Sequence, residues 1–239
     1  AIQHTLDEIL IPEIFYPENQ NQTPPYNFSL GKALSLFPPI SIALSALNFF
    51  GTTLRFETIS QLLRSPLIVG WTQESGARAL LDVKLREIGE PVFTIDTLIG
   101  LSTRFGCDTT CPIFLQRLRS TRKWLMVNQS NVKPGQWSSR FDQILRMMGW
   151  LEDYSLSQEM FQLISAWREL FAELASLDWV MGEITATDAT NLLNQMAGQR
   201  IFQPQVDNQS IQILGPLEAQ GIEFDFLWMA GLHDGVWRS

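Results

Sequence analysis

Apolar residues recur every three or four positions through most of the chain, the spacing that places side chains on one face of an α-helix. The clearest stretch is 156–177, where apolar residues keep this spacing from Met160 to Leu174. At its start, Ser155 and Gln158 lie three residues apart and predict a capping box. Shorter helical faces are predicted at 39–50, 56–63, 77–88, 95–99, 114–118, 137–148 and 188–197.

The signals that bound these helices are Pro and Gly residues. Pro39 stands in the first turn of its helix, where a missing backbone N–H does no harm. Gly51, Gly89 and Gly198 each follow an apolar face and are expected to end a helix.

The two ends of the chain have a different pattern from its middle. Residues 17–27 are polar and contain Pro24 and Pro25, so they predict an exposed loop. Residues 211–214 and 224–230 are short apolar runs near Gly, which is typical of buried strands. The expected fold is mainly α, a helical body with a small α/β portion.

The composition is that of a folded protein that does not cross a membrane. Hydrophobic residues make up 45% of the 239 positions and charged residues 18%, the reverse of the balance in disordered chains. No apolar run approaches the roughly 18 residues needed to span a bilayer. Residues 1–10 carry Asp7 and Glu8 and lack a basic, apolar signal segment. We therefore expect a cytoplasmic protein.

Positive charge is concentrated in the middle of the chain. The net charge is −8, which argues against a free-standing nucleic-acid binder. Residues 55–146, however, contain 13 Lys/Arg and 8 Asp/Glu, a balance of +5, and the remainder carries −13. An acidic chain with this distribution can still present a positive face.

The densest basic run is a candidate DNA-binding surface. Arg119, Arg122 and Lys123 share one face of the predicted helix, and Asp108 is the acid nearest in sequence. Such a face could track a phosphate backbone while an aromatic residue stacks on an unpaired base. The alternative is a solvated surface with a buried Trp; replacing Arg119, Arg122 and Lys123 would then weaken DNA binding no more than replacing Arg78, Lys84 and Arg86. The candidate DNA-binding residues are Arg117, Arg119, Arg122, Lys123 and Trp124.

The chain has two cysteines, Cys107 and Cys111, and we interpret both as small core residues. A disulfide between them is geometrically possible but is disfavoured in a reducing compartment. A zinc site needs about four ligands, and His4 and His233 lie at opposite ends of the chain. We expect no metal.

Motifs for ATP hydrolysis and for nuclease activity are missing. The nearest match to a phosphate-binding loop is Gly31-Lys32-Ala33, in which Tyr26 replaces the first Gly and Ala33 replaces the hydroxyl residue. No Asp followed by Glu-x-Lys is present to hold Mg²⁺, and no Gly-x-Ser-x-Gly elbow occurs. We expect neither ATPase nor nuclease activity, and no cofactor.

The segment from Gly215 to Leu232 carries a family resemblance. It resembles the superfamily I helicase segment Thr-Val-His-x-x-Lys-Gly-Leu-Glu-Phe that precedes a buried strand. Leu217 stands where that family has His, and Gln220 where it has Lys, which removes a polar contact and a phosphate-seeking cation. Some positions of this degenerate motif match the helicase family and others depart from it. The motif positions are Gly215, Leu217, Gln220, Gly221, Glu223 and Phe224.

The pattern is similar to inactivated helicases such as the AddB-type subunits of helicase–nuclease complexes, and to a group of proteobacterial probable DNA repair proteins. Short segments at 28–31, 62–66 and 82–86 also resemble that group's helical insertion, so the likeness covers nearly the whole chain. It implies a RecA-like edge and polar loop at 1–30, a helical insertion at 31–200, and a β-containing part of the RecA-like domain at 201–239.

The resemblance also implies a function and partners. The chain would be an internal, non-catalytic piece of a bacterial DNA repair or recombination protein that positions DNA or packs against partner modules. Those modules would be an upstream RecA-like domain and a downstream nuclease domain. In the family, the residue matching Glu223 lies beside the nucleotide ribose; a structural role in the turn after Gly221 is the alternative. A structural helical spacer or protein-interaction module without DNA contact, and an autonomous enzyme, remain the competing interpretations.

Overall fold

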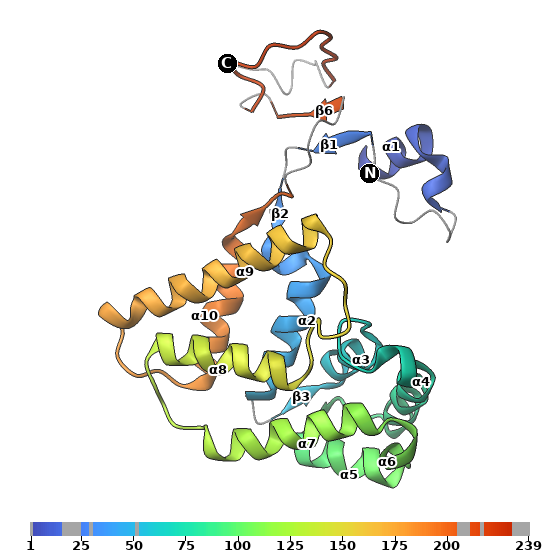
Figure 1. The fold of residues 1–239 in the computed structure, drawn as a ribbon, viewed down its shortest axis with the longest axis vertical. Helices are drawn as coiled ribbons and strands as arrows, with labels where there is room; N and C mark the ends of the chain where they lie inside the picture. Colours follow the sequence, from blue (N-terminus) through green and yellow to red (C-terminus); the bar gives the residue numbers. More distant parts are fainter. Residues whose placement is uncertain are drawn as a thin grey trace. The chain divides into compact units, whose positions relative to one another are not determined.

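Helices form most of the chain, as the apolar spacing predicts, and strands are few and short (Figure 1). The computed structural model describes residues 2–15, 25–28, 31–50, 53–204, 211–215 and 218–230. The α-helices are α1 (Ile2–Leu10), α2 (Pro38–Leu47), α3 (Phe56–Arg64), α4 (Trp71–Ile88), α5 (Ile95–Arg104), α6 (Cys107–Thr110), α7 (Pro112–Val127), α8 (Pro134–Met147), α9 (Gln158–Ser176) and α10 (Ala186–Gln199). The 3-10 turns are η1 (Pro12–Phe15), η3 (Leu34–Leu36), η4 (Asn48–Phe50) and η5 (Leu177–Trp179), and the strands are β1 (Tyr26–Phe28), β2 (Lys32–Ala33), β3 (Leu54–Arg55), β4 (Val92–Phe93), β5 (Ile201–Phe202) and β6 (Ile211–Ile213).

The chain divides into two compact units, and the larger one is continuous in sequence. The smaller unit contains Ala1–Leu30 and Val206–Ser239, and the larger contains Gly31–Gln205. The sequence places the boundaries of the helical part at residues 31 and 200. Whether the smaller unit belongs to a RecA-like domain stays a prediction.

The larger unit interrupts the smaller one between two paired strands. Before the interruption the smaller unit contains β1, and after it β6 runs parallel to β1 with Asn27 aligned to Gln212. Within the larger unit, β2 and β5 form its first and last regular elements and pair antiparallel. Parallel neighbouring strands require a crossover connection, and here the whole helical unit provides it.

Gly31 is required where the chain enters the larger unit. A Cβ atom at this position would lie 2.5 Å from the Ile201 side chain and 2.8 Å from the Phe202 carbonyl oxygen. Real Cβ atoms do not approach other atoms so closely, so any larger residue would push β5 away from β2. Gly31 therefore permits the close approach of the entering and leaving segments.

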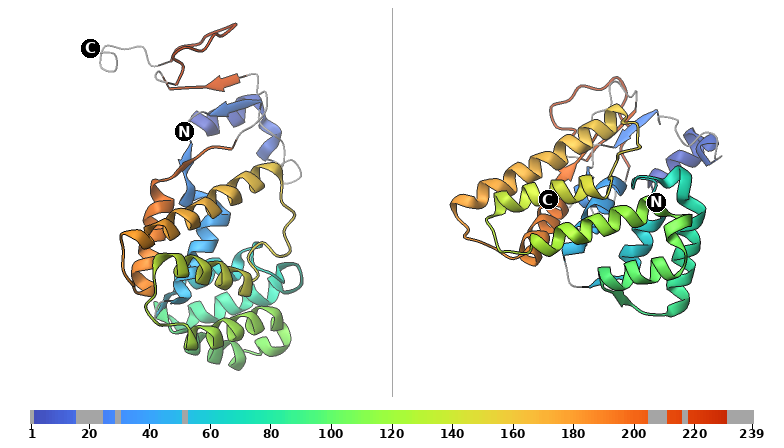
Figure 2. Two further views of the ribbon diagram at one scale, coloured as in Figure 1. Left: turned by 60° about the vertical axis from the view of Figure 1, so that its left-hand side comes forward. Right: turned by 60° about the horizontal axis from the view of Figure 1, so that its bottom comes forward.

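The core of the larger unit is formed where α8 and α9 pack side by side beside α2 and α10 (Figures 1 and 2). Aromatic rings fill this region, and the Phe50 ring meets both Trp137 and Phe141 edge-on at 5.2 and 5.5 Å between centroids. The Trp167 and Phe171 rings are tilted against each other with their centroids 5.0 Å apart. Aromatic pairs of these kinds add to the free energy gained by burying the rings.

The other end of the larger unit is formed by α3 to α7. Helices α3 and α4 pack together, and α5, α6 and α7 follow them, as the cyan-to-green part of Figure 1 shows. Strands β3 and β4 pair antiparallel and bring the start of α3 next to the segment that leads into α5. This arrangement places α7 between α5 and α8, and it fixes the surroundings of the basic cluster.

Two predictions about helix ends are wrong in detail. The N-cap of α9 is Ser157, whose hydroxyl accepts from Met160 N, so the capping box predicted from Ser155 and Gln158 does not form. A capping box does form at α10, between Thr185 and Asp188. Gly198 lies inside α10 and does not end it. Gly51 lies outside the described residues.

The predictions for the chain ends are also corrected. Tyr26–Phe28 is a strand with Tyr26 buried, although the sequence predicts an exposed loop up to residue 27. Residues 17–24 of that predicted loop lie outside the described part. The apolar run 211–214 does contain a strand, but Ile211 is exposed. The run 224–230 is neither a strand nor buried, because no partner strand pairs with it within the described residues.

Candidate functional site

The predicted basic cluster lies on α7, and its arginines are neutralised by acids from other elements. Arg117 makes two bonds of 2.7 and 2.8 Å to Glu152, which follows α8. Arg119 bonds to Asp108 of α6 at 2.7 Å, and its other terminal nitrogen donates to the Thr103 hydroxyl. These pairs connect α7 to the elements on both sides of it.

Arg122 has the best geometry of the three. Its Nε and one terminal nitrogen donate to the two carboxylate oxygens of Asp96, each at 2.6 Å. The hydrogen bond from Arg122 lowers the pKa of Asp96 from its ordinary value, and the same bond raises the pKa of Arg122. Asp96 is 26 residues away in sequence but lies directly opposite Arg122 across the α5–α7 contact.

The expectation that Asp108 alone balances this cluster is therefore wrong. Asp96 and Glu152 join Asp108, so four cations face three anions and the local balance is about +1. Lys123 is exposed and takes part in none of the ion pairs found between described residues. A surface with this balance attracts phosphate only weakly, because each exposed carboxylate offsets one guanidinium.

Trp124 packs against the core and is half-buried. Its ring meets Phe50 edge-on at 6.0 Å between centroids, and its backbone carbonyl accepts from the Asn128 side chain. Phe50 in turn contacts the Trp137 and Phe141 rings. The structure therefore places Trp124 at the edge of the aromatic core, the alternative that the sequence left open.

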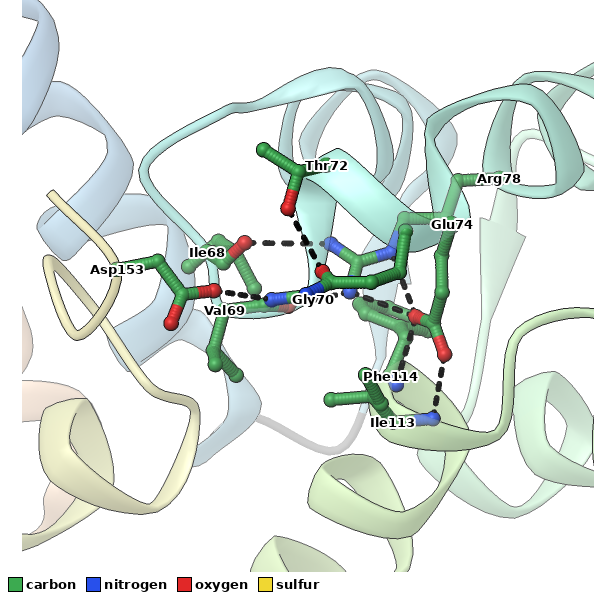
Figure 3. A network of polar contacts seen from close by, with 10 residues as sticks. Ile68, Val69, Gly70, Thr72, Glu74, Arg78, Ile113, Phe114 and Asp153 are labelled. Atoms are coloured by element: carbon green, nitrogen blue, oxygen red, sulfur yellow. Dashed lines mark hydrogen bonds and ion pairs between the residues drawn. The ribbon is translucent and has the colours of Figure 1, made fainter.

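The beginning of α7 is held by a carboxylate from α4 (Figure 3). Glu74 is buried, and its two oxygens accept from the backbone N–H groups of Ile113 and Phe114 at 2.5 and 3.1 Å. These amides belong to the first turn of a helix, where no carbonyl of the same helix is available to accept them. A negative charge there also interacts favourably with the helix dipole.

Arg78 completes this network from the same helix. It is fully buried, and its Nε and one terminal nitrogen donate to Glu74 at 3.1 and 2.8 Å. Its terminal nitrogens also donate to the carbonyls of Ile68 and Val69, in the segment between α3 and α4 (Figure 3). Arg78 is thus a buried structural residue, which makes it unsuitable as a surface control beside Lys84 and Arg86.

Gly70 and Asp153 extend the network to the segment after α8. The N–H of Gly70 donates to an Asp153 oxygen at 2.8 Å, and Gly70 adopts φ +80°, a conformation that favours glycine (Figure 3). The Glu74–Arg78 pair therefore positions the start of α7 and the segment between α3 and α4. The i,i+4 spacing of Glu74 and Arg78 is visible in the sequence, but their burial is not.

The helicase-like motif lies in the smaller unit, in a turn rather than before a buried strand. Gly215 N–H donates to the Glu218 carboxylate at 2.8 Å, and Gly221 adopts φ +83°. The carboxylate bound to this turn is thus that of Glu218, whereas Glu223 and Gln220 are exposed. Phe224 is half-buried, and Leu217 lies outside the described residues. A role for Glu223 at a nucleotide stays a prediction.

Cys107 and Cys111 are buried free thiols, which confirms that they are core residues. The hydrogen bond between the two thiols lowers the pKa of Cys107 and, with burial, raises that of Cys111. Among the described residues, no three His, Cys, Asp or Glu side chains gather in a way that could hold a metal ion. Lys32 and Ala33, from the rejected phosphate-loop match, form strand β2.

The sequence gives no signal for a groove in the larger unit. It has a volume of about 720 Å³ and lies between the start of α2, the end of α3 and the start of α9. Its lining is mostly apolar and includes Phe37, Pro38, Ile42, Met160 and Phe202. These residues are far apart in sequence, and their helical spacing predicts only core faces.

No protein-family model, curated protein or solved structure matches the chain. The likeness to inactivated helicases therefore stands on the motif residues alone and stays a prediction. The helices in the described part of the chain are each too short or too polar to span a bilayer.

Proposed function

We propose that the chain is a non-catalytic, helicase-like segment of a cytoplasmic DNA repair or recombination protein. In this proposal its helical unit packs against partner modules and does not hydrolyse ATP. The observation that carries the proposal is the interruption of one small unit, between parallel strands β1 and β6, by the continuous helical unit 31–205. A helical insertion between two parts of a small α/β domain is the arrangement that the resemblance implies.

The apolar segment after the motif supports this proposal. The side chains of Phe226 and Trp228 are each 95% exposed, and Ile222, Leu227 and Met229 are exposed as well. A contiguous apolar segment of this kind marks a surface that another protein element covers. In the family, the corresponding residues form a buried strand of the RecA-like domain, so the proposal assigns the missing cover to the partner modules.

The ion pairs of the basic cluster favour a role in packing over a role in DNA binding. Arg117, Arg119 and Arg122 each hold an acid of a neighbouring element, and a DNA phosphate would have to displace those acids. The three arginines therefore serve mainly to connect α7 with α5, α6 and the segment after α8.

Contact with DNA is the second candidate function, and one observation favours it. Lys123 and Arg119 are exposed, and so are the acids Asp96 and Asp108. Exposed ion pairs contribute at most about 1 kcal/mol, so phosphates could compete for the guanidinium groups at low salt. The sequence-based DNA-binding set of Arg117, Arg119, Arg122, Lys123 and Trp124 thus stays a proposal.

Salt dependence of DNA binding distinguishes the two functions. If the helical unit only packs against proteins, fluorescence anisotropy with single- and double-stranded DNA should show weak binding, with a slope of log affinity against log salt shallower than about −1. Replacing Arg119, Arg122 and Lys123 with Glu should change this no more than replacing the exposed Arg55, Arg146 and Arg168. A slope of about −3 or steeper that is lost only in the first triple variant would establish the DNA function instead.

Hydrogen exchange tests the packing proposal directly. In the parent protein that the resemblance implies, the amides of 222–230 should exchange at least about tenfold more slowly than in the chain alone, because partner modules cover them. Equal exchange in both proteins would contradict the proposal. ATPase and nuclease assays of the chain should show no turnover.

A further inference from the structure

The groove between α2, α3 and α9 is lined by apolar side chains that are partly or largely exposed. Pro38, Ile42 and Met160 line it, and so does Leu36, which is 70% exposed. A volume of about 720 Å³ lies within the roughly 300–1,000 Å³ range of ligand sites in proteins. When a partner covers an exposed Leu beside such a hollow, apolar surface is removed from water and the complex is stabilised.

Polar groups of opposite charge line the same groove from different helices. Arg64, near the end of α3, donates its Nε to the Ser60 carbonyl, which leaves the two terminal nitrogens of the guanidinium for another acceptor. Glu159 lies in the first turn of α9. Neither residue belongs to an ion pair between described residues. The groove therefore offers a cation and an anion to an occupant.

Gln61 adds a hydrogen-bond donor to this set. Its side-chain oxygen accepts from the Ser45 hydroxyl at 3.2 Å, which leaves its N–H₂ group to donate. Apolar surface with a few placed polar groups is the usual composition of a site that recognises a specific ligand.

The elements around the groove favour a helical occupant over an extended one. An extended peptide adds to a sheet edge through backbone hydrogen bonds, but apart from Phe202 no lining residue belongs to a strand. Phe202 belongs to β5, which is paired with β2. A helix can instead insert apolar side chains at positions i, i+3, i+4 and i+7 between the surrounding helices.

We infer that this groove binds an amphipathic helix of a partner protein, one that carries an acidic residue for Arg64 and a basic residue for Glu159. The inference rests on the proposed packing role and specifies the partner's chemistry. Leu36, Ile42 and Met160 contact the apolar face of that helix, and the two charged residues set its direction. The opposite charges make the site selective, because a helix inserted backwards would place like charges together.

A peptide library tests the inference on the intact chain. The probe is a phage-displayed library of helical peptides of about 14 residues, roughly four turns, with Leu, Ile, Met or Phe at the four apolar positions and Glu, Lys, Gln or Ala elsewhere. Enriched peptides should carry both Glu and Lys at consistent positions. Their binding to the chain, measured by fluorescence anisotropy, should saturate.

Two matched variants identify the surface. Leu36→Glu should weaken peptide binding about tenfold or more, whereas Phe161→Glu should change it less than about twofold. Both residues are large, apolar and well exposed, at 70% and 63%, so neither change disturbs the core, but Phe161 does not line the groove. With Arg64→Glu, the binding of peptides whose Glu is changed to Lys should recover to within about threefold of the original.

Three outcomes would overturn the inference. No enrichment above the unselected library would mean that the groove binds no such helix. Equal losses from Leu36→Glu and Phe161→Glu would place binding elsewhere. A dimer of the chain in sedimentation that is abolished by Leu36→Glu would make a second copy the occupant. None of these outcomes affects hydrogen exchange at 222–230, so a failure here is distinguishable from a failure of the proposed function.

Discussion

Glu74 and Arg78 form a buried ion pair one helical turn apart on α4, and each also binds the backbone of a different segment. Glu74 accepts from the first turn of α7, and Arg78 donates to the segment between α3 and α4. The pair therefore connects three parts of the larger unit through groups that have no contact with water (Figure 3).

Removing either partner should strongly destabilise the protein, because the other charge would stay buried without compensation. We expect Glu74→Leu and Arg78→Met each to lower the free energy of unfolding by about 3–5 kcal/mol. The double variant should lose much less than the sum of the two, because no isolated charge remains. Urea unfolding in a double-mutant cycle measures this coupling.

The matched control is Arg146→Met, since Arg146 pairs with Asp142 at the same i,i+4 spacing but on the surface. It should cost no more than about 0.5 kcal/mol. If the two losses at Glu74 and Arg78 simply add, the pair is not a coupled unit.

The start of α9 gives a second prediction, which follows from the corrected cap. Ser157 accepts from Met160 N at 3.2 Å, whereas Ser155 caps no helix. Ser157→Ala should therefore lower the free energy of unfolding by about 1 kcal/mol, and Ser155→Ala by no more than a few tenths. Thermal unfolding of both variants checks this prediction. Equal effects of the two substitutions would contradict the assignment of Ser157 as the N-cap of α9.

Much of the fold follows from the sequence because helices leave a local signal. The apolar spacing within 56–63 and 156–177 predicts α3 and α9, and both are present. Which of Ser155 and Ser157 caps the helix depends on where the chain enters α9, and the spacing of the apolar residues does not fix that position. Apolar content likewise predicts a strand at 224–230, but a strand also needs a paired neighbour.

The surroundings of the candidate site could not be predicted, because they depend on contacts between residues that are far apart in the sequence. The basic run around Arg119 is obvious in the sequence, but Asp96 and Glu152 approach it from 26 and 35 residues away. Because these acids pair with the arginines, the predicted phosphate-binding surface is instead a set of ion pairs that connect helices. The groove at Met160 could not be predicted for the same reason, because its walls come from three separate helices.

Tyr26 provides a pH-dependent prediction for the smaller unit. Burial, followed by its hydrogen bond to Asp7, raises the pKa of Tyr26 to about 12. Because the raised pKa belongs to the folded state, this stabilisation is complete below pH 10 and is lost as the pH rises through about 12. The tyrosinate absorbance of the native chain minus that of Tyr26→Phe should therefore titrate near pH 12. A midpoint near 10 would mean that Tyr26 is exposed and unbonded in solution.

The pairing of β1 with β6 is the basis of the insertion proposal, and an engineered disulfide tests it most directly. Asn27 lies opposite Gln212, and aligned residues of neighbouring strands are close enough for a disulfide.

Under mild oxidation the Asn27→Cys, Gln212→Cys variant should form a cross-link between these positions, identified by mass spectrometry of the unreduced digest. The native cysteines should stay free because they are buried. The control variant Asn27→Cys, Ile211→Cys should cross-link far less, because successive residues of a strand point to opposite faces of the sheet. Efficient cross-linking of the aligned pair alone is the predicted result; equal cross-linking of both pairs, or of neither, would contradict the insertion of the helical unit between two paired strands.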